Sequence, residues 1–133
     1  MDFPYKQYGK LFFRPVIPVF LTADGNSFGY EALLDSGADY SIFPAEIARE
    51  LGINFEAGTK TEFGGIGKDG KKPVGYFHKI TLQLESDSFE TLVAFSDDIA
   101  DYGYGVLGQI GFFDHFTVKF MYQDRKVRVS KTI

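Results

Sequence analysis

The chain of 133 residues contains no cysteine and no tryptophan. Without cysteine it can form no disulfide and no thiolate zinc site, and a reducing compartment is compatible with its composition, so we expect a cytoplasmic protein. Histidine is also scarce, with two copies. His78 lies on the apolar face of an alternating segment and His115 lies among phenylalanines, which favours packed or surface side chains over metal ligands.

A strong positive charge and a long apolar run are also missing. The 14 basic and 18 acidic residues give a net charge of −4, which argues against nucleic acid and anionic membranes as partners. The apolar run from Leu11 to Leu21 is interrupted by Arg14, Pro15 and Pro18, so it predicts neither a secretion signal nor a membrane span. We therefore expect a soluble chain without a nucleic-acid or membrane partner.

The acidic residues clustered after residue 96 do not form a metal-binding pattern. Asp97, Asp98 and Asp101 lack the alternating Asp spacing and the glycine of a calcium loop. A solvated turn is the expected structure, and the sequence predicts no metal site and no cofactor.

The abundant residue types indicate β structure, and we expect a single domain over residues 1–133. Phe (15) and Tyr (8) are frequent, and the 15 glycines separate short periodic runs, as in all-β proteins. A hairpin is predicted from Val16–Thr22 and Ser27–Leu34 around the turn Asp24-Gly25-Asn26, with the incoming strand starting at a sheet edge because of its prolines. Period-two alternation or β-rich composition predicts further strands over 78–84, 89–95, 116–120 and 127–129.

Two short helices are expected between these strands. Pro44 opens a segment in which Ile47 and Leu51 share one helical face, and Gly52 is a typical helix terminator. Ile110 to His115 is the second candidate for a helical turn.

The tripeptide Asp35-Ser36-Gly37 is the most informative motif. By chance such a tripeptide occurs in roughly one chain in fifteen of this length, usually as a solvated turn. Here an apolar run leads into it, Ala38-Asp39 follows, and Val106-Leu107-Gly108 occurs downstream, a combination far rarer by accident. Hydrolysis by aspartates requires two carboxylates around one water, and the chain has one copy of the motif, so two chains would have to meet.

Three segments together resemble the retropepsin-like aspartic proteases, and especially their single-domain bacterial members. They are Leu34-Asp35-Ser36-Gly37-Ala38-Asp39, Gly64-Gly65-Ile66-Gly67 and Val106-Leu107-Gly108. The resemblance implies an all-β fold, a closed barrel with one or two short helices that is half of a two-fold symmetric dimer. It also implies an aspartic endopeptidase that acts on polypeptides as a homodimer without a cofactor.

The resemblance further assigns roles to individual residues. The catalytic loop would be Asp35, Ser36 and Gly37, with Leu107 and Gly108 as structural neighbours in the psi-shaped core. Substrate would be bound by a flap and by cleft residues: Leu33, Ala38, Asp39, Gly65, Ile66, Gly67 and Val106.

Two departures keep alternatives open. Gln109 stands where retroviral enzymes have an arginine, so their ion pair near the dyad is absent, and the segment from Met1 to Phe13 is longer than the minimum. A catalytically silent dimer of this fold that binds peptides or proteins is the first alternative. A β-barrel binding protein unrelated to proteases is the second.

Overall fold

The computed structural model describes residues 1–64, 72–99 and 102–132. Its first long element is the predicted hairpin, β4 (Val16–Ala23) and β5 (Asn26–Leu34), paired from Val16↔Leu33 to Ala23↔Asn26. Asp24 and Gly25 at the turn have φ values of 51° and 80°. Two consecutive positive φ angles are typical of the tight turn that matches the twist of a hairpin.

Six strands close into a barrel, which confirms the predicted all-β architecture. The ring runs β4-β5-β10-β6-β9-β8 and returns to β4 through the pairs from Phe20↔Gln83 to Thr22↔Thr81. At its start β4 pairs with β5 alone among the described strands, as its prolines predicted. The other barrel strands are β6 (Ile42–Pro44), β8 (Val74–Leu84), β9 (Asp87–Ser96) and β10 (Gly105–Leu107), and β7 (Thr59–Glu62) adds to the edge of β8.

The barrel encloses the hydrophobic core. Along β4 the residues Ile17, Val19 and Leu21 are at most 1% exposed, while Pro18 and Phe20 between them face outward. The interior is completed by Leu82, Leu84, Val93, Phe95, Phe43, Leu107 and Phe112. This alternation of buried and exposed positions follows from the period-two geometry of a strand.

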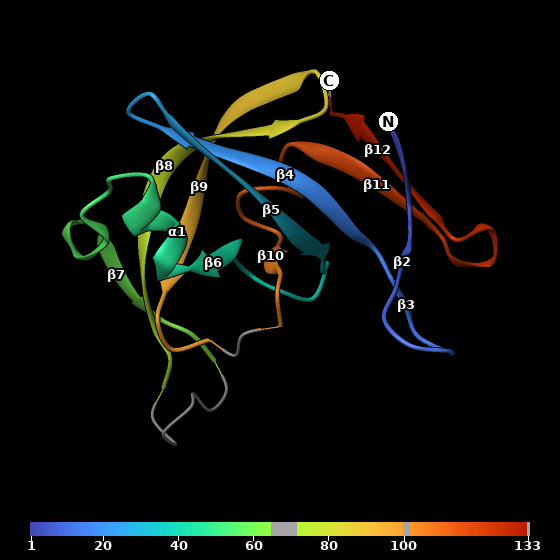
Figure 1. Cartoon of the computed structure of the whole chain (residues 1–133), viewed down its shortest axis with the longest axis horizontal. Helices are drawn as coiled ribbons and strands as arrows, with labels where there is room; N and C mark the ends of the chain where they lie inside the picture. Colours follow the sequence, from blue (N-terminus) through green and yellow to red (C-terminus); the bar gives the residue numbers. More distant parts are fainter. Residues whose placement is uncertain (65–71, 100–101, 133) are drawn as a thin grey trace.

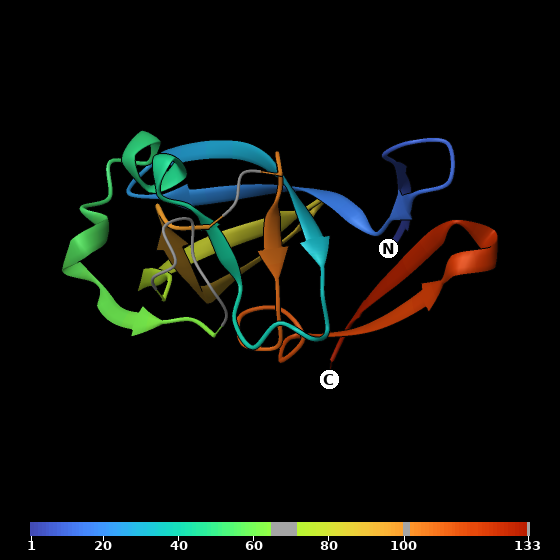
Figure 2. The same ribbon diagram turned by 90° about the horizontal axis from the view of Figure 1, so that it is seen from below.

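Both ends of the chain form a second unit beside the barrel, visible at the right of Figures 1 and 2. We call residues 1–14 and 116–132 the terminal lobe. Its three-stranded sheet has the order β1-β12-β11, and β2 pairs with β3 as a small hairpin. The strands are β1 (Asp2–Pro4), β2 (Lys6–Gln7), β3 (Phe13–Arg14), β11 (Phe116–Met121) and β12 (Lys126–Lys131).

One α-helix, α1 (Ala45–Glu50), is present in the described residues, and it confirms the helix predicted after Pro44. Gly52, two residues beyond its last residue, has φ +76° and donates its N–H to the Arg49 carbonyl. The 3-10 helices η1 (Phe55–Ala57) and η2 (Tyr122–Asp124) were not predicted.

The second predicted helical turn, Ile110 to His115, is wrong. This segment consists of hydrogen-bonded turns, because Gly111 has φ +103° and lies so close to the Leu92 carbonyl that a Cβ would be 2.4 Å from its oxygen. A residue in that conformation interrupts helical geometry.

Among the helices of the described residues, none has the length and apolar character needed to cross a bilayer.

Candidate active site

The strand β5 ends at Leu34, and two other segments form hydrogen bonds with the main chain of Leu34 and of the next residue, Asp35. The Leu34 N–H donates to the Pro15 carbonyl (2.9 Å), and the Asp35 N–H donates to the Leu107 carbonyl (3.0 Å). The short strand β10 runs parallel to β5 and antiparallel to β6, between these two strands. This is the psi-shaped arrangement expected around the motif, and it anchors Asp35 on a strand end instead of a free loop.

The next residues fold into a tight turn around the Asp35 carboxylate. The Gly37 N–H donates to Asp35 Oδ1 at 2.9 Å, and the Ala38 N–H donates to the Asp35 carbonyl at 3.1 Å. A Cβ on Gly37 would lie 3.3 Å from the same Oδ1. The carboxylate is therefore oriented by the backbone, while it stays half-exposed between buried Leu34 and exposed Ser36.

Gly108 lies behind this turn and has no room for a side chain. A Cβ there would be 2.3 Å from the Tyr40 carbonyl oxygen and 2.7 Å from that of Ala38. Its N–H donates to Ser41 Oγ (3.0 Å), and this buried hydroxyl donates to the Ile110 carbonyl at 3.0 Å. The absence of a side chain at Gly108 thus allows the two segments of the psi arrangement to approach each other closely.

Gln109 contributes a contact that sequence reasoning missed. Its side-chain amide donates to the Ser36 carbonyl (2.9 Å), and its backbone N–H donates to the Ala38 carbonyl (2.8 Å). The residue that stood out as a departure from the retroviral pattern therefore holds the aspartate turn through neutral hydrogen bonds. The buried Ser41 was missed as well, because a lone serine between apolar residues gives no signal in the sequence.

The predicted substrate-binding residues fall into two groups. Leu33 and Val106 are register partners on β5 and β10, both half-buried, and Asp39 is exposed in the turn after the motif. Ala38 lies between, half-buried. The structure brings these residues together with Asp35, whereas the predicted flap residues Gly65, Ile66 and Gly67 lie outside the described residues.

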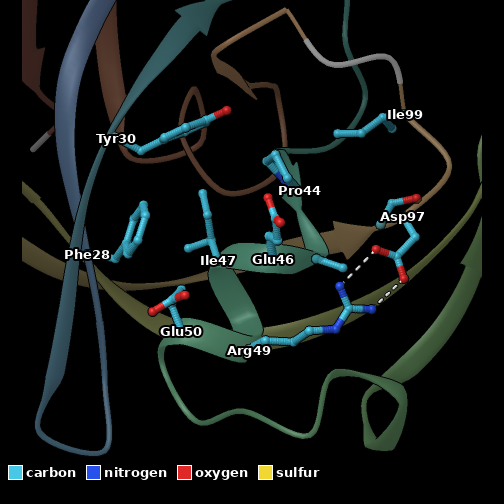
Figure 3. Close-up of a pocket in the computed structure, with 11 residues that line it drawn as sticks. Phe28, Tyr30, Pro44, Glu46, Ile47, Arg49, Glu50, Asp97 and Ile99 are labelled. Atoms are coloured by element: carbon cyan, nitrogen blue, oxygen red, sulfur yellow. Dashed lines mark hydrogen bonds and ion pairs between the residues drawn. The ribbon is translucent and has the colours of Figure 1, made fainter.

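A cavity of about 470 Å³ lies elsewhere, between α1 and the start of β5 (Figure 3). Phe28 and Tyr30 line one side and Ile47 of the helix another. Tyr30 is five residues from Asp35 along an extended strand, roughly 17 Å, and no residue predicted for the site lines the cavity. Arg49 donates to both carboxylate oxygens of Asp97 at its edge (3.1 and 2.6 Å), and this bond raises the pKa of the guanidinium.

No group of three or more His, Cys, Asp or Glu side chains with the geometry for a metal ion occurs in the part of the chain that the structure describes.

Comparison with known proteins finds similarity in structure alone. No protein-family model matches the sequence, and no curated protein is similar to it. A crystal structure of a retropepsin-like aspartic protease from Rickettsia conorii aligns over 97% of this chain and 89% of that chain, with TM-score 0.62 and 12% identity. The EIAV protease complexed with the inhibitor HBY-793 aligns over 77% and 88%, with TM-score 0.50 and 24% identity. The chain therefore has the retropepsin-like fold, as predicted.

Proposed function

We propose that this protein is an aspartic endopeptidase that works as a homodimer, with Asp35 of each copy supplying one carboxylate to a shared site. The observation that carries the proposal is the position of Asp35, on a strand end at the psi crossing with its carboxylate oriented by the Gly37 N–H. The two structural neighbours described above are proteases by name, which supports hydrolysis of polypeptides as the reaction class.

The chemistry follows from two like charges in one site. Two carboxylates about 3 Å apart cannot both ionise at low cost, so they share one proton. The ionised carboxylate takes a proton from a water that attacks the scissile carbonyl carbon, and the protonated carboxylic acid gives its proton to the carbonyl oxygen. In the collapse of the tetrahedral intermediate the newly protonated carboxyl group gives its proton to the leaving nitrogen, the C–N bond breaks, and the ionised carboxylate takes a proton from a diol hydroxyl. This restores the pair with one shared proton, and no cofactor is needed.

The neighbouring residues have supporting roles in this proposal. The Ser36 hydroxyl reaches the other copy across the two-fold axis, and Gly37 leaves room for substrate to pass over the carboxylates. Ala38 and Asp39 bind the substrate main chain. The apolar side chains Leu33 and Val106, with Ile66 between Gly65 and Gly67 of the flap, favour apolar residues on either side of the cleaved bond.

The second candidate function is a silent module of the same fold that binds peptides without cutting them. The observation that favours it is Gln109, whose neutral amide replaces the cation of retroviral enzymes beside the aspartate turn. A dimer in which the two aspartate turns are arranged differently would still bind an extended peptide, but it would not bring two carboxylates to one water.

The deciding experiment incubates the chain with a peptide library between about pH 4 and 7, where a shared proton is expected, and identifies new termini by mass spectrometry. Asp35→Asn should abolish cleavage. The control is Asp24→Asn in the β4–β5 turn, since asparagine tolerates the positive φ of that position, and it should cleave as the parent does. Absence of cleavage by the parent, with retained binding of peptides, would favour the silent module.

A further inference from the structure

The cavity between α1 and the start of β5 has no part in the proposed reaction. Its volume of about 470 Å³ lies in the range of small-ligand sites and far exceeds the ~30 Å³ that one water occupies. The described residues that line it come from β5, from α1 and from the end of β9 with the residues after it, and none of them is assigned to the site around Asp35. The cavity therefore has room for a ligand of its own.

One wall of this cavity is aromatic and apolar. Phe28 and Tyr30 are two positions apart on β5 and so share a face of the strand, with ring centroids 6.3 Å apart. Both rings are half-buried, and in Figure 3 they lie on the side of the cavity opposite Glu46, with Ile47 of the helix near them. Such a wall can cover the alkyl stem and the flat face of a ligand while a polar end stays outside it.

The helix side of the cavity supplies two carboxylates. Glu46 and Glu50 are four residues apart on α1, which makes them neighbours on the helix surface, and both are exposed. Among the described residues, neither of them forms an ion pair. Two like charges at this spacing oppose helix formation, and a bound cation would remove that repulsion.

The basic residue in the lining is already engaged by other groups. Arg49 donates to both carboxylate oxygens of Asp97 (3.1 and 2.6 Å), and its guanidinium lies 4.9 Å from the centroid of the Phe55 ring. The charge of Arg49 is thus balanced by Asp97, so the charges of Glu46 and Glu50 remain. The contacts of Arg49 also show, beside the cavity, that a carboxylate and an aromatic ring together hold a guanidinium.

The charge of the surrounding barrel has the same sign as these two glutamates. Residues 15–115 contain six Lys or Arg and 16 Asp or Glu, a net charge of −10, whereas the terminal lobe contains eight Lys or Arg and two Asp, a net charge of +6. The field of the barrel therefore raises the local concentration of cations and disfavours anionic ligands.

We propose that this cavity binds an arginine residue of a polypeptide, at a site separate from Asp35. The guanidinium group stacks on Phe28 and Tyr30 and donates to Glu46 and Glu50, for which its planar set of donors is better suited than an ammonium group. The choice of a polypeptide rests on the proposed function. An extended chain spans the roughly 17 Å between Tyr30 and Asp35 with about five residues, so one substrate is long enough to occupy both sites.

A titration followed by nuclear magnetic resonance tests the ligand and its place. The probe is the capped peptide Gly-Ser-Arg-Ser-Gly, which lacks apolar residues for cleavage. It should produce saturable shifts of the backbone amides of residues 27–30 and 45–50. The same peptide with citrulline in place of arginine keeps the shape but not the charge, and it should bind at least about tenfold more weakly, because a charge-assisted hydrogen bond is lost.

Exposed substitutions test the residues of the site without touching the core. Glu46→Gln/Glu50→Gln should weaken binding of the arginine peptide at least about tenfold and remove its advantage over the citrulline peptide. Phe28→Leu keeps an apolar wall and should cost about two- to fivefold through loss of the cation–π contact. The matched control Glu62→Gln/Glu90→Gln changes two exposed glutamates of β7 and β9 outside this cavity and should leave affinity within about twofold.

Three results would overturn the inference. They are equal binding of the arginine and citrulline peptides, shifts centred on residues 35–39 with none in α1, and tighter binding of free arginine than of the peptide, which would assign the cavity to a small guanidinium compound. Asp35→Asn should bind the peptide as the parent does. Binding that persists in a chain that cuts no peptide would refute the proposed function alone, and a protease whose cavity does not distinguish arginine from citrulline would refute this inference alone.

Discussion

Replacing Gly108 with alanine should disrupt the crossing beneath the candidate catalytic loop. The added Cβ would lie 2.3 Å from the Tyr40 carbonyl oxygen, 2.7 Å from the Tyr40 carbonyl carbon and 2.7 Å from the Ala38 carbonyl oxygen. All three are backbone atoms, so no side chain can rotate away to relieve the overlap. The main chain on at least one side of the psi arrangement has to move.

The expected loss of folding stability follows from that geometry. Overpacking of a well-packed site costs about 1–3 kcal/mol, and a collision with fixed backbone belongs at the upper end of this range. For a domain of this size about 3 kcal/mol corresponds to a fall in Tm of roughly 10 °C. Since the displaced segment includes Ala38, which follows the Asp35 turn directly, cleavage should fall further than the folded fraction does.

Chemical unfolding monitored by circular dichroism, with peptide cleavage measured on the same samples, checks this prediction. Gly64→Ala is the control, because a Cβ at Gly64 meets no atom within 4 Å and should change stability by less than about 0.5 kcal/mol. Equal unfolding free energies for Gly108→Ala and the control would show that the close approach of the two segments does not exist in solution.

Three further substitutions probe separate contacts. Ser41→Ala leaves the buried Gly108 N–H without its hydroxyl acceptor and should lower the unfolding free energy by about 1–3 kcal/mol in urea titrations; a loss below about 0.5 kcal/mol would contradict the geometry. Gln109→Ala removes the amide that holds the Ser36 carbonyl and should reduce kcat for peptide cleavage with little change in Tm, whereas an unchanged kcat would make the contact incidental. The Asp2 carboxylate has its pKa lowered from 3.8, chiefly by the hydrogen bond from Arg128, so its contribution to stability is present above that value and disappears as pH falls through the lowered pKa. The Tm values of the parent and Asp2→Asn should differ at neutral pH and converge in strong acid, and a constant difference would refute this linkage.

Local signals in the sequence predicted the elements that carry the site. The Asp24-Gly25 pair predicted the hairpin turn because few residues tolerate consecutive positive φ values, and the apolar run before Asp35 predicted a strand that ends there. Gly108 was assigned to the core crossing through the family resemblance, and the distances to Tyr40 supply the physical reason.

Contacts between distant segments could not be predicted in the same way. The hydrogen bond from the Gln109 side chain to Ser36 joins residues 73 positions apart, and no local pattern encodes such a pairing. The helical turn expected at Ile110 is wrong for a related reason, because the positive φ of Gly111 and its close approach to the distant Leu92 carbonyl leave no signal in the local sequence. Two strands of the terminal lobe were predicted, over 116–120 and 127–129, but their union with β1 at the other end of the chain was not, because that pairing joins distant segments.

We expected no anionic partner because the net charge of the whole chain is negative. That total conceals a separation of positive and negative charge between the lobe and the barrel. A net charge of −4 describes neither the lobe nor the barrel, since each presents a much larger charge of its own sign. At ordinary salt, charges more than about 10 Å apart are largely screened from each other, so an exposed group at the lobe interacts mainly with the charges near it. The total charge is therefore a poor guide to the partners that each of the two regions can approach.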